Sequence, residues 1–232
     1  MNEKEHLENF KAACRMYPQE KKDLEENRNS TPNPDPGLTQ LFVYMQEDID
    51  YVENTFRDIR QKCGTNAELM TWLLYVERKT QTALMEEWKV SRKQQQYAQN
   101  RWLQLLLNER KKTEKDDLFA FRCSCRTYLI GKQKLEENKG ITDMNRIRKR
   151  TLQLIHEDIA YTEKILDSIQ KQYGEEAWKL TVEVLINGRT QEETAEKAGI
   201  TKRKLQYSME KWLKAVLTIL KNNQCEYFSG GQ

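Results

Sequence analysis

The chain has 232 residues and a formal net charge of +3, with 38% hydrophobic and 32% charged residues. No apolar run is long enough to span a bilayer and the N-terminal MNEKEHLENF is charged, so we expect no membrane span, no signal peptide and a cytoplasmic location. Helix-forming residues dominate and only 9 Gly and 4 Pro are present, which predicts an all-α protein. The small net charge does not by itself indicate nucleic-acid binding, so an electrostatic argument for it must come from local clusters of basic residues.

The first half of the chain is expected to begin with a helix over about 4–27. NRNSTPNPDPG (27–37) follows it and holds three of the four prolines, which predicts an irregular loop. In the second half, a helix is expected over 115–138. A long amphipathic helix should come next, because apolar residues recur there at three- and four-residue steps up to Gly174, a predicted C-cap.

The two halves resemble each other. QEDIDYVENTFRDIRQKCG (46–64) parallels HEDIAYTEKILDSIQKQYG (156–174), which lies 110 residues later in the chain. FKAACRMY (10–17) likewise parallels FRCSCRTY (121–128), which lies 111 residues later. We therefore predict two tandem copies of one helical domain, 1–112 and 113–232, a repeat too long for a solenoid unit. The charged run NERKKTEKDD (108–117) is their expected joint.

Residues 190–217, TQEETAEKAGITKRKLQYSMEKWLKAVL, are read as two helices around a tight turn. Thr190 and Glu193 have the spacing of a capping box, and Gly199 can adopt the left-handed conformation that ends the first helix. Ile200 is expected to fill the corner and Thr201 to cap the second helix. The positions expected to be buried in that helix are Leu205, Met209, Trp212 and Val216. This pattern is typical of a helix-turn-helix, whose second helix enters the DNA major groove.

The exposed face of this second helix carries groups that bind DNA. Cations and backbone N–H groups at its start can reach phosphates and guanine edges. Gln206 can form two hydrogen bonds with adenine, and Tyr207 can reach a phosphate. The predicted DNA-binding residues are Thr190, Thr201, Lys202, Arg203, Lys204, Gln206, Tyr207 and Lys211, with Lys214 on the same stripe. The alternative is a helical hairpin whose basic face is only solvated.

RTQEETAEKAGITKRKLQYSMEKWLKAVL (189–217) resembles the helix-turn-helix of bacterial sigma-factor region four and of the phage regulators that share it. That family shows a Thr or Ser start, Glu-Ile-Ala, a small residue at the turn, Val/Ile-Thr/Ser and a basic recognition helix. The resemblance implies that base edges are read by Lys202, Arg203, Lys204, Gln206 and Tyr207. Two positions depart from the family pattern, since Thr194 replaces an aliphatic residue and Trp212 a small one.

The corresponding stretch of the first copy, 80–107, keeps the aliphatic corner and the cap but differs in its core. The replacements are Met85 for Ala195, Lys89 for Gly199 and Gln95 for Leu205. Overpacking and a buried amide each cost about 1–3 kcal/mol, so we expect the helical architecture to persist with weaker or altered DNA contact. The candidate contacts are Ser91, Arg92, Lys93 and Gln96. The alternatives are full DNA reading after repacking by Trp72 and Trp88, or a role in dimerisation or protein binding.

Other clusters point to no chemistry. CSC (123–125) lacks a second Cys or His pair, and the two histidines, His6 and His156, do not complete a zinc site, so we expect buried helical cysteines and no metal. A glycine-rich phosphate loop and a nucleophile elbow are both missing, so we expect neither a cofactor nor an enzyme. RIRKR (146–150) is read either as a phosphate-contacting cluster or as plain surface.

These patterns lead to one hypothesis and one alternative. The hypothesis is a sequence-specific, double-stranded-DNA-binding transcriptional regulator of prokaryotic or phage origin, in which two helix-turn-helix units imitate a dimer on two half-sites. A conventional sigma factor is disfavoured, because it would carry a dissimilar domain before region four. The alternative is an all-α protein-interaction module that binds RNA polymerase or a host defence effector through the degenerate first repeat; a homodimer is a further candidate assembly.

Overall fold

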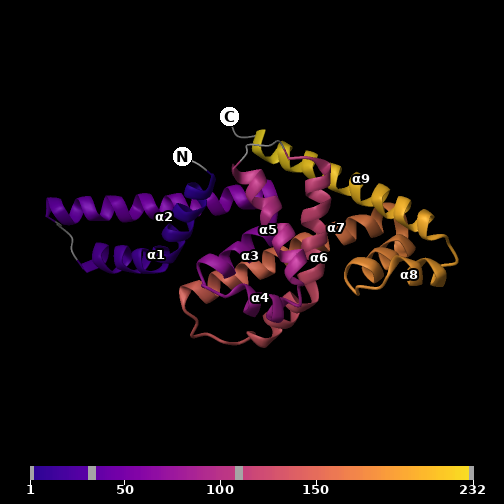
Figure 1. The fold of residues 1–232 in the computed structure, drawn as a ribbon, viewed down its shortest axis with the longest axis horizontal. Helices are drawn as coiled ribbons and strands as arrows, with labels where there is room; N and C mark the ends of the chain where they lie inside the picture. Colours follow the sequence, from indigo (N-terminus) through magenta and orange to yellow (C-terminus); the bar gives the residue numbers. More distant parts are fainter. Residues whose placement is uncertain (1–2, 31–34, 108–111, 230–232) are drawn as a thin grey trace. The chain divides into compact units, whose positions relative to one another are not determined.

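The computed structural model describes residues 3–30, 35–107 and 112–229, and in these ranges the chain forms helices α1 to α9 and no β-strand (Figure 1). The prediction of an all-α protein is confirmed. The chain divides into two compact units, unit 1 (Met1–Arg110 with Asp143–Thr151) and unit 2 (Lys111–Thr142 with Leu152–Gln232). The predicted domains, 1–112 and 113–232, differ from this division chiefly in the placement of Asp143–Thr151. Within the described ranges, no helix has both the length and the apolar character needed to cross a bilayer.

Unit 1 contains five helices in the described ranges. They are α1 (Glu3–Ser30), α2 (Pro36–Cys63), α3 (Thr65–Tyr75), α4 (Gln81–Trp88) and α5 (Arg92–Leu107). α1 and α2 pack side by side, and α1 is bent (Figure 1), consistent with Pro18 inside it, which lacks a backbone N–H. α1 extends to Ser30, beyond the predicted helix end at 27, and the predicted loop therefore narrows; its residues 31–34 lie outside the described ranges.

The core of unit 1 is built around aromatic rings from α1, α2 and α3. Phe10 packs edge-on against Phe56 with ring centroids 5.5 Å apart, and Tyr17 packs edge-on against Trp72 at 5.8 Å. Trp72, predicted as a core residue, is 4% exposed. Such aromatic contacts add to the burial of apolar area and hold α1 against the α2–α3 pair.

The segment Asp143–Thr151 belongs to unit 1 because its side chains contact buried polar groups there. Glu68 is 3% exposed and forms ion pairs with Arg60 and with Arg150, the latter at 2.9 Å. The Thr151 hydroxyl accepts a hydrogen bond of 3.1 Å from the Trp72 indole. Of the basic cluster RIRKR, Arg150 is thus held by a buried carboxylate and Arg146 pairs with Glu25. Arg150 therefore has a structural role, whereas the pair of Arg146 lies at the surface and leaves both readings of the cluster open.

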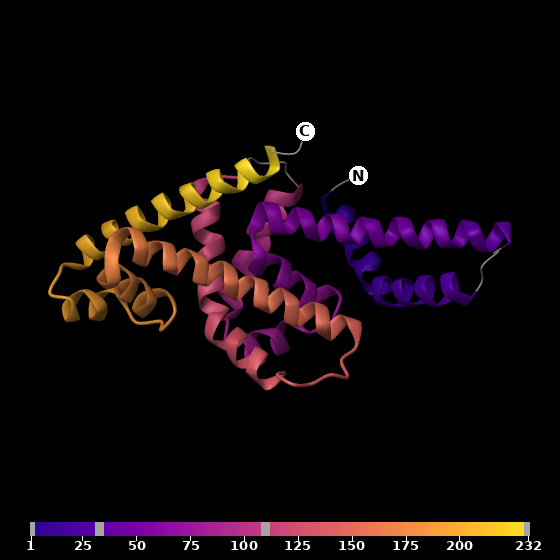
Figure 2. The same ribbon diagram turned by 180° about the vertical axis from the view of Figure 1, so that it is seen from behind.

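Unit 2 contains α6 (Glu114–Glu137), α7 (Arg146–Leu185, except its first turns), α8 (Gln191–Lys197) and α9 (Lys202–Ser229). α6 agrees with the helix predicted over 115–138; residues 108–111 of the predicted joint lie outside the described ranges. Gly174 has φ +88° and interrupts α7, as its predicted capping role requires. α9 contacts α6 over part of its length (Figure 2).

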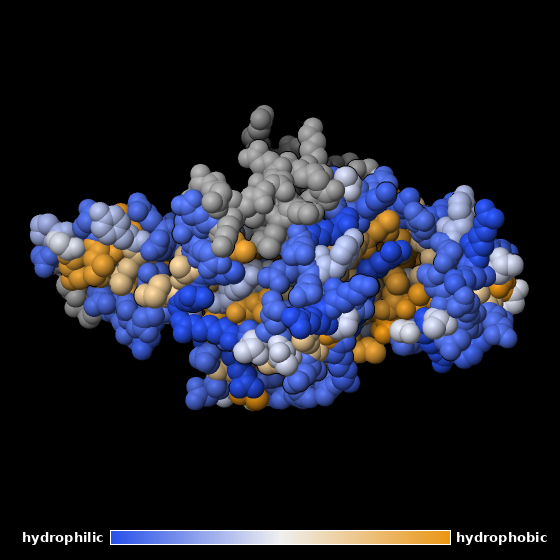
Figure 3. All heavy atoms as spheres, in the orientation of Figure 1, coloured by the Kyte–Doolittle hydropathy of each residue, from blue (hydrophilic) through white to orange (hydrophobic). Residues whose placement is uncertain are grey.

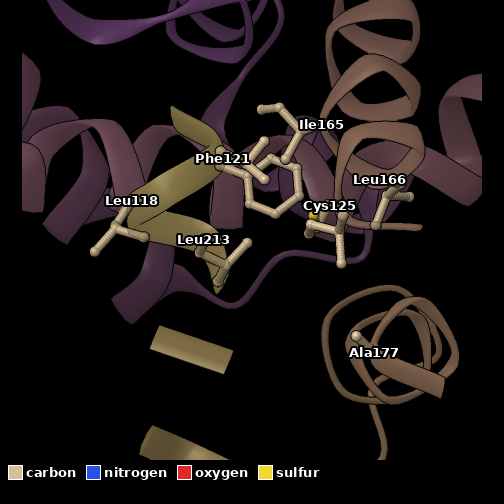
Figure 4. Close-up of a cluster of buried hydrophobic side chains, with 9 residues drawn as sticks. Leu118, Phe121, Cys125, Ile165, Leu166, Ala177 and Leu213 are labelled. Atoms are coloured by element: carbon tan, nitrogen blue, oxygen red, sulfur yellow. The ribbon is translucent and has the colours of Figure 1, made fainter. Parts of the chain in front are cut away.

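A buried cluster from α6, α7 and α9 forms the main core of unit 2. Figure 4 shows Phe121 of α6 pointing toward Ile165 of α7, and Leu213 of α9 belongs to the same cluster. Cys125 is 1% exposed there, and burial raises the pKa of its thiol well above the usual value. The cysteines of CSC are thus buried helical residues, as predicted. Among the described residues, no group of His, Cys, Asp and Glu side chains is placed to hold a metal ion.

Three positions of positive φ in unit 1 have counterparts of positive φ in unit 2 at a single constant offset in the numbering, whereas Gly140 of unit 2 (φ +84°) has none. The pairs are Gly64 (φ +96°) with Gly174 (φ +88°), Arg78 (φ +57°) with Gly188 (φ +70°), and Lys89 (φ +51°) with Gly199 (φ +64°). Left-handed conformations are uncommon for residues other than glycine, so a coincidence of three such pairs at one offset is informative. The two units thus share a positive φ at these three positions.

A matching hydrogen-bonded group joins the first helix of each unit to its long helix. The Tyr17 hydroxyl donates to Glu53 at 2.9 Å and accepts from Lys21 at 2.9 Å. In unit 2 the Tyr128 hydroxyl donates to Glu163 at 2.8 Å and accepts from Lys132 at 3.1 Å. Burial disfavours the charged carboxylates, but the hydrogen bonds from tyrosine and lysine outweigh it, so the pKa values of both glutamates are lowered.

These lowered pKa values predict an acid-sensitive contribution to stability. Because each folded-state pKa lies below that of the unfolded chain, the carboxylates stabilise the fold above about pH 4.5, and this contribution is lost as the pH falls through the folded-state pKa. We expect the double variant Glu53→Gln/Glu163→Gln to be less stable than the parent at pH 7 and to lose less stability on acidification. Urea unfolding between pH 7 and pH 3 measures this. Parallel stability curves for parent and variant would show that the two glutamates do not contribute in this way.

Candidate nucleic-acid interface

The turn between α8 and α9 is closed by backbone hydrogen bonds. The Ile200 N–H donates to the Ala195 carbonyl at 3.0 Å, and the Gly199 N–H donates to the Glu196 carbonyl at 3.0 Å. Gly199 between them has φ +64°, and a Cβ built there would meet nothing within 4 Å. Glycine is therefore favoured here by the backbone conformation and not by a lack of space.

Both helices at this turn are capped as the sequence predicts. The Thr190 hydroxyl accepts from the Glu193 N–H at 3.2 Å, and the Glu193 carboxylate accepts from the Thr190 N–H at 3.1 Å and from its hydroxyl at 2.9 Å. The Thr190 hydroxyl bond is the largest cause that lowers the pKa of Glu193. At the start of α9, the Thr201 hydroxyl accepts from the Lys204 N–H at 3.2 Å. Thr190 and Thr201 thus fix helix ends, and their contact with DNA stays a prediction.

A small buried cluster fixes α9 to the rest of unit 2. Leu205 (0% exposed) and Met209 (5%) pack with Ala195 and Leu180, and Ile200 lies against them at the corner. Val216, further along α9, is also fully buried. Trp212 is only half-buried, whereas it was predicted to be buried; its neighbour Leu213 points into the core instead.

Thr194, which departs from the family pattern, is accommodated by a local hydrogen bond. The side chain is buried, with 3% of its surface exposed, and its hydroxyl donates to the Thr190 carbonyl at 2.9 Å. A buried hydroxyl with a backbone partner avoids most of the cost of burying a polar group. The polar residue at this position is therefore compatible with a well-packed α8.

The opposite face of α9 is exposed and basic. All six residues predicted there (Lys202, Arg203, Lys204, Gln206, Tyr207, Lys211) are exposed. Arg203 and Lys204 form no ion pair with any residue that the structure describes, whereas Lys202 pairs with Glu192 at the surface and Gln206 donates to Gln191 at 2.7 Å. Tyr207 is 72% exposed. Over α8 and the first turns of α9, the surface in Figure 3 is mainly hydrophilic.

The cations on this face differ in how freely they can bind a ligand. Lys214 forms an ion pair of 2.8 Å with Glu210 one turn earlier, and the hydrogen bond that it donates to this carboxylate raises the pKa of Lys214. The Lys202 pair with Glu192 is also a surface contact, which is weak and screened by salt. Residues 189–214 contain seven Lys or Arg and four Glu, a local net charge of +3. Arg203, Lys204 and Lys211 are therefore the cations of this face most directly available to an anionic partner.

The turn between α4 and α5 in unit 1 shares a backbone hydrogen bond with the α8–α9 turn but differs in another: the Lys89 N–H donates to the Met85 carbonyl, whereas the Gly199 N–H donates to the Glu196 carbonyl. The Val90 N–H donates to the Met85 carbonyl at 3.1 Å, the counterpart of the Ile200–Ala195 bond. Lys89 takes the left-handed conformation that Gly199 has in unit 2. Sequence reasoning missed this, because a lysine gives no signal for a left-handed backbone.

The cap of α5 was also missed in part. The Gln94 carboxamide oxygen accepts from the Ser91 N–H and from the Ser91 hydroxyl, both at 3.0 Å. In return, the Ser91 hydroxyl accepts from the Gln94 N–H at 3.3 Å. The Ser-x-x-Gln spacing is a capping-box signal that the sequence contained.

The core beneath the α4–α5 turn is repacked around larger and more polar residues. Trp88 is 1% exposed and Met85 half-buried, which agrees with the predicted refilling by Trp88, whereas Trp72 packs against Tyr17 and Phe56. Gln95 occupies the position of Leu205 and is 7% exposed, and neither atom of its carboxamide has a hydrogen-bond partner in the described part of the chain. The predicted unpartnered buried amide is therefore present.

Comparisons with known proteins give no independent identification of this surface. No model of a protein family, no curated protein and no solved structure matches the chain. The candidate interface is therefore defined by its own geometry: a capped turn, a buried anchor under α9 and an exposed face on which Arg203 and Lys204 have no ion-pair partner among the described residues.

The left-handed positions of the two turns predict opposite effects of exchanging their residues. Gly199→Ala should lower the free energy of unfolding by about 1 kcal/mol, because a residue with a Cβ is strained at positive φ. Lys89→Gly should raise it by a similar amount, since relief of that strain exceeds the added freedom of the unfolded chain. Chemical denaturation of both variants measures the two shifts. Shifts of equal sign would contradict this interpretation of the two corners.

The unpartnered amide of Gln95 predicts a stabilising substitution. Gln95→Leu should raise the free energy of unfolding by about 1–3 kcal/mol, because it removes buried polar atoms that lack hydrogen bonds and restores the residue found in unit 2. Leu205→Gln is the matched control and should destabilise by at least as much. If Gln95→Leu destabilises the protein, the amide has a partner in solution and this reading of the core is wrong.

Proposed function

We propose that the chain is a sequence-specific, double-stranded-DNA-binding regulator of transcription and that α9 is its main recognition helix. The observation that carries this proposal is the exposed face of α9, where Arg203 and Lys204 have no ion-pair partner among the described residues and Tyr207 is largely exposed, above a buried anchor at Leu205 and Met209. A rigid helix that presents cations, an amide and a phenol on one face has the chemistry that base edges and phosphates require.

The two helices around Gly199 form a helix-turn-helix of the kind that sigma-factor region four and related phage regulators contain. In that arrangement α8 lies across the DNA backbone and the first turns of α9 enter the major groove. Arg203 would then bind guanine O6 and N7, Gln206 an adenine edge, and Lys202 and Lys204 the phosphates. Lys202 would exchange its surface pair with Glu192 for a phosphate on binding.

A tandem duplication accounts for the repeated features of the two units. The three left-handed corners at one constant offset support it, as do the Tyr17–Glu53 and Tyr128–Glu163 groups. A regulator built in this way would act on double-stranded DNA in the cytoplasm of a prokaryotic cell. The alternative of binding to RNA polymerase or a host effector through the degenerate first repeat stays a hypothesis.

Removal of the three cations at the start of α9 tests the proposal. Lys202→Ala/Arg203→Ala/Lys204→Ala should weaken binding to duplex DNA selected by the parent by about 10-fold or more. The slope of log K against log salt should become shallower by about 1–3 units, because fewer counterions are released. Fluorescence anisotropy over a salt series measures both quantities.

A matched control separates loss of contact from loss of charge. Arg126→Ala/Lys164→Ala/Lys171→Ala removes three exposed cations from α6 and α7 and should leave binding close to that of the parent. An equal loss of DNA affinity in both triple variants would show that the effect comes from net charge and not from contacts made by α9. A parent that selects no duplex DNA from a random pool would reject the proposal and favour the protein-interaction hypothesis.

A further inference from the structure

The α4–α5 turn of unit 1 carries a second surface with the geometry of the candidate interface. The first backbone hydrogen bond of α5 joins the same positions as that of α9: the Gln95 N–H donates to the Ser91 carbonyl at 3.0 Å, as the Leu205 N–H donates to the Thr201 carbonyl at 3.0 Å. Thr80 caps α4 at φ −67° and ψ 153°, and Thr190 caps α8 at φ −67° and ψ 150°. The replacements in the core have therefore left the turn intact.

The exposed face of α5 has retained DNA-binding chemistry. Arg92 and Lys93 are exposed and make no ion pair with any described residue, as is true of Arg203 and Lys204. Gln96 is exposed, and Tyr97 is 57% exposed with its hydroxyl accepting from Arg101 at 3.3 Å. Residues 79–104 contain five Lys or Arg and two Glu, a local net charge of +3 that equals the net charge of residues 189–214. The exposed face of α5 thus matches that of α9 in local net charge and in residue types suited to DNA.

The two surfaces are not interchangeable, because the third residue of α5 differs from the third residue of α9. Lys204 projects freely from α9, whereas its counterpart Gln94 has its carboxamide oxygen occupied by Ser91. The order of the first two cations is also reversed, with Arg92 at the position of Lys202 and Lys93 at the position of Arg203. An arginine forms paired hydrogen bonds with guanine, whereas a lysine acts as a single charged donor. The base preferred at each step of α5 should therefore differ from that of α9.

The corner of the α4–α5 turn supplies a charge that the α8–α9 turn lacks. Lys89 is exposed and occupies the left-handed position where unit 2 has Gly199. A lysine at this corner lies beside the start of the recognition helix, where phosphate contacts are made in helix-turn-helix complexes. The cation lost at Gln94 is thus offset by one at Lys89, which keeps the affinity for the backbone while changing the base contacts.

We propose that α5 is a second recognition helix and that one chain binds an operator made of two non-identical half-sites. This inference rests on the proposed function, since it assigns the second half of the same DNA ligand. It predicts an asymmetric operator bound by a single chain, in place of the palindrome that a symmetric dimer would read.

Selection of bound fragments from random duplex DNA tests the inference. The parent should select two conserved blocks of different sequence. Arg92→Ala/Lys93→Ala should lose one block and keep the other, and should weaken binding to the two-block site by about 10-fold or more while changing affinity for the isolated α9 block less than about 2-fold. Lys22→Ala/Arg57→Ala is the matched control in unit 1 and should select both blocks.

A conservative variant guards against a folding defect. Arg92 occupies the position of Lys202, which is assigned to a phosphate, so Arg92→Lys keeps the charge and the helix and should retain both the salt dependence and the two selected blocks. A parent motif with one block, or two blocks that persist in Arg92→Ala/Lys93→Ala, would overturn the second reader while leaving α9 as a DNA-binding helix. A parent that selects no motif would instead reject the proposed function itself.

Discussion

The left-handed residue that ends the first helix of each turn is the constraint on which the candidate interface depends. At Gly199 a single residue with φ +64° stops α8 and redirects the chain, so that Thr201 can cap a new helix. A right-handed residue at this point would continue α8 and leave the cations of α9 without a defined direction. The same conformation at Lys89 shows that unit 1 maintains the corner even with a residue that disfavours it.

The corner is useful only because α9 is anchored behind it. Leu205 and Met209 bind the first turns of α9 to the α8 corner, and Leu213 and Val216 continue into the core around Phe121. The cations therefore project from a helix whose opposite face is buried. Recognition surfaces of this kind lose little conformational entropy on binding, since the side chains that position them are already ordered. The exposed face and the buried face of α9 are two consequences of one amphipathic pattern.

Local sequence signals predicted most of the candidate site, and distant contacts account for what they missed. The Thr190–Glu193 box, Gly199, Leu205 and Val216 follow from spacing within a few residues, and the structure agrees with each. The pairing of Arg150 with Glu68 could not be predicted, because the two residues are far apart in the sequence. Trp212 was wrongly predicted to be buried, because where several apolar residues follow one another in a helix, the sequence alone does not show which of them faces the core. Lys89 was missed because the tertiary fold overrides the preference of the residue.

The central claim is that the first turns of α9 lie in the major groove of a specific DNA site, and methylation interference on the selected site tests it most directly. Methyl groups on guanine N7 occupy the major groove, whereas those on adenine N3 occupy the minor groove. We expect guanine N7 methylation within the block assigned to α9 to prevent binding, and this interference to disappear when Arg203 is replaced by Ala. Interference confined to adenine N3, or a pattern unchanged by Arg203→Ala, would contradict the claim.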